Sequence, residues 1–156
     1  MESQVNNINL LEVAEMQLVY RNKIKASLRP SITRADDAYK IFLNNWDEDR
    51  IEMVEQFKIM VLNRANKVLG IFEVSTGGTT GTVVDLKLIF SAALHANASA
   101  IILAHNHPSG NLKPSEADKT ITSKIVDAGK LLDIQVLDHL IITTEGFFSF
   151  ADEGLL

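Results

Sequence analysis

A chain of 156 residues, 46% of them hydrophobic, is long enough to form one domain with a buried core. Its net charge of -5 argues against a protein that binds nucleic acid mainly by neutralising phosphates, and it has no cysteine for disulfides or thiolate ligands. We find no apolar run of about 18 residues and no signal-peptide pattern, so we expect a cytoplasmic protein without membrane contact.

Strands and helices are expected to alternate along the chain. Residues 1–30 are interpreted as an N-terminal arm with a candidate strand at 16–20, and residues 31–156 as a metal-binding domain. The elements of that domain are predicted from apolar periodicity and from capping and turn residues. In chain order they are a helix that opens at Ser31 or Thr33, strands at 57–62 and 68–74, a helix from Asp85 through His95, a strand at 99–104, a helix from Ser115 through Leu132, and strands at 135–143 and 147–150. This order predicts an α/β (α+β) fold with a single mixed β-sheet flanked by helices.

His105, His107 and Asp118 are the candidate metal ligands. Residues i and i+2 of an extended chain project to the same side, so the two imidazoles should face one point at the end of the strand. Ser115 opens the next helix, whose first turn carries Asp118 back toward them. Two nitrogens and one oxygen, without cysteine to close the site, predict a zinc ion whose fourth position is open to water.

Parts of this pattern also have ordinary structural interpretations. Ser115-x-x-Asp118 is a capping-box pattern, although a serine can cap with its oxygen and still donate its hydroxyl proton elsewhere. His95 is expected to be a surface or capping residue. His139 lies in an apolar strand, so we expect a hydrogen-bonded core or supporting histidine rather than a fourth ligand.

The combined motif resembles a known family. His105-x-His107-Pro108 followed by Ser115-x-x-Asp118 looks like the JAMM/MPN+ metalloproteases, and the strings HNHPSG, PSEAD and LDH at 137–139 are similar to the bacterial RadC branch. The resemblance implies a JAB/MPN-like fold with layers like those of cytidine deaminases. It also implies one Zn²⁺ per chain on His105, His107 and Asp118, with Ser115 helping to stabilise the oxyanion. Because the helix-hairpin-helix region usual in full-length RadC proteins is not expected in this chain, we expect no strong direct binding of nucleic acid.

A hydrolase of this kind needs a general base that takes a proton from the attacking water and passes it to the leaving amine. Glu55 and Glu73 are the candidates, and Glu55 is favoured because its spacing and Glu-x-Phe context resemble the glutamate of the family. The sequence thus predicts a zinc-dependent hydrolase of an amide bond, peptide or isopeptide, in a protein or peptide substrate, linked to DNA repair or mobile elements. The alternative is a non-catalytic binding or scaffold module of the same fold, and self-association of the chain is left open.

Overall fold

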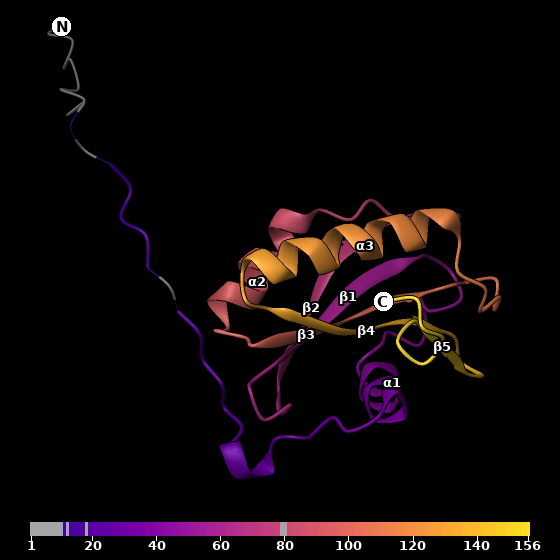
Figure 1. Cartoon of the computed structure of the whole chain (residues 1–156), viewed down its shortest axis with the longest axis horizontal. Helices are drawn as coiled ribbons and strands as arrows, with labels where there is room; N and C mark the ends of the chain where they lie inside the picture. Colours follow the sequence, from indigo (N-terminus) through magenta and orange to yellow (C-terminus); the bar gives the residue numbers. More distant parts are fainter. Residues whose placement is uncertain (1–10, 12, 18, 79–80) are drawn as a thin grey trace, which may run out of the picture.

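In the part of the chain that the structure describes, five strands form one mixed sheet with helices on both of its faces (Figure 1). The computed structural model describes residues 11, 13–17, 19–78 and 81–156. The strands lie in the order β2-β1-β3-β4-β5. Their bounds are β1 (Gln56–Leu62), β2 (Val68–Thr76), β3 (Ala100–Asn106), β4 (Gln135–Ile142) and β5 (Phe147–Ser149). The predicted α/β architecture with a single mixed sheet is therefore confirmed.

Three α-helices among the described residues cover this sheet. Helix α1 (Ala35–Asn44) lies on one face, and α2 (Leu86–His95) and α3 (Glu116–Leu131) lie on the other (Figure 1). A short 3-10 helix, η1 (Ala26–Leu28), precedes them. No helix among the described residues combines the length and the apolar character that crossing a membrane would require.

The central strands explain where the polar side chains of the next section point. β1 is antiparallel to β2 and β3, β3 is parallel to β4, and β4 is antiparallel to β5. Every residue of β1 and β3 is buried, and most of their residues are apolar. Within them Phe57 and Ile59 pack with α2 and α3, whereas Met60 packs with α1. Phe57 pairs with His105, so His105 faces α3 and its neighbour Asn106 faces the α1 side.

The predicted start of the first helix is wrong. Helix α1 begins at Ala35 rather than at Ser31 or Thr33, because the Asp37 carboxylate accepts hydrogen bonds from the Thr33 hydroxyl and from the Thr33 and Arg34 N–H groups. These bonds hold the chain in a non-helical conformation ahead of the helix and lower the pKa of Asp37 to about 2.

The candidate strand at 16–20 is not formed by the residues described there, of which Leu18 is not one. Val19 instead contacts the His95 ring through its backbone, and the Tyr20 hydroxyl donates a hydrogen bond to the Leu69 carbonyl. His95 thus lies on the surface, where it holds the N-terminal segment against α2. The division of the chain into an arm at 1–30 and a domain at 31–156 stays a prediction.

Candidate metal centre

Three side chains meet where β3 ends and α3 begins. His105 is the penultimate residue of β3, His107 follows the strand, and Asp118 lies in the first turn of α3. His105 Nε2 lies 3.0 Å from His107 Nε2 and 3.3 Å from Asp118 Oδ1, and His107 Nε2 lies 3.7 Å from Asp118 Oδ2. The structure thus brings together the three side chains that the sequence predicts as ligands.

These distances fit a tetrahedral zinc site. With zinc–nitrogen bonds of about 2.0–2.1 Å, two ligand atoms of a tetrahedron lie about 3.3 Å apart, close to the middle of the observed range. The group contains no further histidine, cysteine or carboxylate among the described residues. Such a set of two imidazoles and one carboxylate could hold zinc and leave a coordination position open, as catalytic zinc sites do.

The tautomer of His107 is set by the hydrogen bond of Nδ1, the ring nitrogen that points away from the other two ligands. His107 Nδ1 lies 2.5 Å from the backbone carbonyl oxygen of Asn111. A carbonyl oxygen can only accept, so Nδ1 carries the proton and donates it. In the neutral ring Nε2 then keeps its lone pair, which faces the other two ligands.

A chain of hydrogen bonds sets the tautomer of His105 in the same way. The Thr122 hydroxyl donates to the Asp118 carbonyl oxygen at 2.5 Å, and this use of its single proton leaves its oxygen to accept from His139 Nδ1 at 2.6 Å. His139 Nε2 must then accept from His105 Nδ1, which lies 2.8 Å away. In the neutral ring, His105 Nε2 then keeps its lone pair, which faces the ligand cluster.

Burial keeps His139 neutral, as this chain of bonds requires. The ring is fully buried, and this desolvation lowers the pKa of His139 well below its ordinary value. Phe57 and Phe150 pack against the ring. His139 is thus the buried, hydrogen-bonded histidine that the sequence predicts, and it lies outside the group of three candidate ligands.

Ser115 and Asp118 form the predicted capping box while both also line the site. The Asp118 N–H donates to Ser115 Oγ at 3.1 Å, and the Ser115 N–H donates to Asp118 Oδ2 at 2.7 Å. Ser115 Oγ uses a lone pair in this cap, so its hydroxyl proton can point into the adjoining cavity.

Electrostatics favour a cation between the three ligands. Burial alone would raise the pKa of Asp118, but hydrogen bonds with His105 and His107 lower it well below its ordinary value. The hydrogen bond with Asp118 in turn raises the pKa of His107. Without a metal, a proton shared between an imidazole and the carboxylate occupies the place that a divalent cation would take.

A cavity of about 340 Å³ opens beside the ligands. Glu55 and Ser115 line it together with the apolar side chains of Phe57, Val84 and Ile121. The negative charge of Glu55 also contributes to the raised pKa of His107. The cavity therefore offers a carboxylate and a hydroxyl next to a metal-binding position.

Glu73 lies away from this cavity. Its carboxylate accepts hydrogen bonds from Thr76 Oγ1 at 2.6 Å and Gln56 Nε2 at 3.0 Å, and it lies 3.9 Å from Lys58 Nζ. Lys58 packs over the Trp46 ring on the α1 side of the sheet. Of the two glutamates that the sequence left open, only Glu55 lines the cavity beside the candidate ligands.

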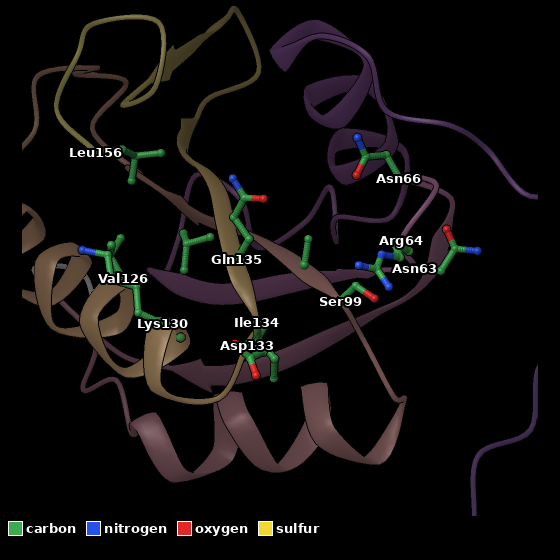
Figure 2. Close-up of a pocket in the computed structure, with 13 residues that line it drawn as sticks. Asn63, Arg64, Asn66, Ser99, Val126, Lys130, Asp133, Ile134, Gln135 and Leu156 are labelled. Atoms are coloured by element: carbon green, nitrogen blue, oxygen red, sulfur yellow. The ribbon is translucent and has the colours of Figure 1, made fainter.

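A larger cavity, of about 910 Å³, lies at the other end of the sheet (Figure 2). It is formed by the turn between β1 and β2, the amino ends of β3 and β4 and the carboxyl end of α3. None of the three metal ligands lines it. The polar residues around it include Asn63, Arg64, Asn66, Ser99, Lys130, Asp133 and Gln135.

Comparison with known proteins relates this chain to one family. Residues 32–155 match the family model of the RadC-like JAB domain. A UPF0758 protein of Flavobacterium johnsoniae is 44% identical over 144 residues, which cover 92% of this chain and 62% of that protein. A UPF0758 protein of Porphyromonas gingivalis is 42% identical over 82% of this chain and 56% of its own length. The UPF0758 protein YfjY of Escherichia coli is 45% identical over 65% of this chain and 64% of its own length. The chain thus spans less than two thirds of these relatives, and their names state no activity.

Proposed function

Because this chain belongs to the family of RadC-like JAB domains, we propose that it is a zinc-dependent hydrolase of amide bonds in proteins or peptides. The observation that carries this proposal is the preset ligand group, in which hydrogen bonds fix both imidazoles with Nε2 free and directed at the Asp118 carboxylate. Such preorganisation is typical of metal sites, where outer hydrogen bonds orient the ligating rings.

The residues around the cavity have the chemistry that amide hydrolysis requires. A zinc ion held by His105, His107 and Asp118 would act as a Lewis acid, polarising the carbonyl group and making water a nucleophile near neutral pH. Glu55 accepts a proton from the attacking water and returns it to the leaving amine as the C–N bond breaks. The Ser115 hydroxyl donates to the carbonyl oxygen as negative charge develops on it.

The position of Ser115 suits this task because the serine is already fixed by the helix. Its oxygen accepts the Asp118 N–H, so the hydroxyl group does not have to be ordered when the substrate binds. The apolar side chains of Phe57, Val84 and Ile121 limit the water around the reacting group.

Glu55 and Glu73 provide a matched pair of variants for the test. Purified wild type should carry one zinc per chain and cleave members of a mixed library of linear and isopeptide-linked peptides, read by mass spectrometry. Glu55→Gln should retain zinc but lose about 100-fold or more of the cleavage rate, since general base catalysis contributes at least that much. Glu73→Gln should keep both zinc and cleavage, because its carboxylate lies away from the cavity.

Three results would contradict parts of this proposal. Cleavage by Glu55→Gln at the wild-type rate would show that Glu55 is not the base. Wild-type protein that is purified without zinc would contradict the metal mechanism. A zinc-loaded wild type that cleaves neither type of bond would instead favour a non-catalytic binding or scaffold module of the same fold.

A further inference from the structure

Asn106 stands between the two histidine ligands, but its side chain points to the opposite face of the sheet. It is the last residue of β3 and is fully buried. The alternation of side chains along a strand sends His105 toward α3 and Asn106 toward the segment that joins α1 to β1. That segment carries Glu55.

The Asn106 side chain bonds both peptide groups that flank Glu55. Its Oδ1 accepts the Gln56 N–H at 2.7 Å, and its Nδ2 donates to the Val54 carbonyl oxygen at 2.8 Å. The same Nδ2 also donates to the Ile51 carbonyl oxygen at 2.6 Å. One amide group thus holds the chain on both sides of Glu55.

The remaining backbone groups of Glu55 bond the loop that follows β2. The Glu55 N–H donates to the Gly78 carbonyl oxygen at 3.0 Å, and the Glu55 carbonyl accepts the Gly77 N–H at 2.8 Å. Gly77 has no room for a side chain, because a Cβ atom there would lie 2.1 Å from the Gly81 carbonyl oxygen. Every backbone polar group next to Glu55 therefore has a partner, although Glu55 precedes the first residue of β1.

We propose that Asn106 is a positioning residue that holds the Glu55 carboxylate toward the metal ligands. This inference rests on the proposed function, which assigns proton transfer to Glu55. It means that three consecutive residues organise both halves of the site, with His105 and His107 binding the metal on one face and Asn106 fixing the base from the other.

The three backbone partners of the Asn106 side chain require an amide group at this position. The three backbone partners present one donor and two acceptors, and asparagine offers one acceptor oxygen and two N–H groups at the same reach. Aspartate keeps the acceptor but loses both donors, and serine has a single donor on a shorter side chain. Either change leaves buried backbone groups without partners, so the segment that carries Glu55 should move.

The position of Glu55 can be measured without a substrate. In protein labelled with ¹³C, the Glu55 carboxyl resonance is identified by its loss in Glu55→Gln, and its response to added zinc reports whether the carboxylate faces the metal. Wild-type Glu55 should shift on addition of zinc. Asn106→Asp and Asn106→Ser should bind zinc with nearly unchanged affinity, because their ligands are intact, yet lose most of this shift.

Asn45→Asp is the matched control. Asn45 Nδ2 donates one hydrogen bond to the Ile41 carbonyl within α1, so the same amide-to-acid change is made on an exposed side chain. This variant should keep the full response of Glu55 to zinc.

The outcomes separate this inference from the proposed function. If wild-type Glu55 does not respond to zinc, its role as base is wrong and Asn106 positions no base. If wild-type Glu55 responds and both Asn106 variants respond equally, only the role of Asn106 is overturned.

Hydrogen exchange in the wild type keeps the inference testable if the variants do not fold. The Gln56 N–H and the Asn106 side-chain amide should both exchange about 100-fold more slowly than the exposed Asn66 side-chain amide, since a buried bond must open before it exchanges. Fast exchange of either group would overturn the inference.

Discussion

The two ends of the sheet carry cavities that differ in how their polar side chains are held. At the smaller cavity, beside the candidate ligands, His105 and His107 each have a hydrogen-bond partner on the outer ring nitrogen, and His139 behind them is bonded through both of its nitrogens. In the larger cavity at the other end, Asn63 Oδ1 accepts the Ala65 and Lys67 N–H groups, whereas the exposed side chains of Arg64 and Gln135 make no hydrogen bond to another described residue. The smaller cavity is the organised one.

The difference has a simple physical origin. Buried polar groups destabilise a protein unless they are bonded, so the fully buried His139 requires partners that also fix its direction. Exposed side chains are solvated and free to rotate, so they present no fixed geometry to a ligand. For this reason we place the proposed function at the smaller cavity, whose polar groups are preorganised, rather than at the larger one.

Removal of a ligand should have the largest effect and would test this comparison directly. Asp118→Asn keeps an acceptor for the Ser115 N–H, so the helix cap survives while the charged ligand is lost. Zinc affinity should fall by more than about 100-fold, since the loss of even an outer supporting group costs 10- to 100-fold.

Asp133→Asn at the larger cavity is the matched control, and its zinc content should not change. The zinc content of the purified variants can be measured by elemental analysis. His105→Ala and His107→Ala should also lose the metal. Retention of one zinc per chain by Asp118→Asn would refute the site.

A fall in pH should release the metal from the candidate site at the smaller cavity. The hydrogen bond with Asp118 raises the pKa of His107, so a proton competes for Nε2 at a higher pH than in a free imidazole. Only the neutral ring binds zinc, so affinity is full above this raised pKa and is lost as the pH falls through it. The expected loss is about tenfold per pH unit for each displaced proton. Competition with a chromophoric chelator measures it, and an affinity independent of pH between about 5 and 8 would contradict it.

A smaller effect is expected from the outer hydrogen bonds of the site. Thr122→Val removes the hydroxyl that accepts from His139 and donates to the Asp118 carbonyl. His139 Nδ1 then loses its partner, and the His105 ring is less firmly held, so zinc affinity should fall by about tenfold.

Thr120 gives a matched control on the same helix. Its hydroxyl bonds the Glu116 carbonyl in the same way, but the residue is exposed and contacts no histidine. Thr120→Val should leave zinc affinity unchanged. Equal affinities of the two variants would show that the bonds behind His105 do not contribute to metal binding.

The sequence was sufficient for the parts of this arrangement that depend on local periodicity. The i, i+2 spacing of His105 and His107 and the capping pattern of Ser115 and Asp118 predict a common location, because each depends only on the geometry of one strand or one helix end. The alternation of strands and helices likewise predicts the single mixed sheet.

His139 was predicted as a supporting residue from its place in an apolar strand, but the other supporting residues could not be predicted because they depend on packing between distant segments. Thr122 reaches His139 only because α3 packs against β4. The one available signal was its position four residues after Asp118, on the same side of the helix. Asn106 bonds a segment about fifty residues earlier in the chain, and Asn111 contributes only a backbone carbonyl, which no residue pattern marks.

The last prediction concerns the binding of nucleic acid at the larger cavity, where we expect the smallest effect. Arg64 and Lys130 line this cavity, but so does Asp133, and Lys130 Nζ lies 3.3 Å from the exposed carboxylate of Asp127. With a net charge of -5 on the chain, these two cations are not expected to neutralise enough phosphates for strong binding. Gel-shift titrations with duplex, single-stranded and branched DNA at physiological salt should therefore show no binding tighter than about 1 µM. Tighter binding that is lost in Arg64→Ala would make the larger cavity a second functional site and reverse the comparison between the two ends of the sheet.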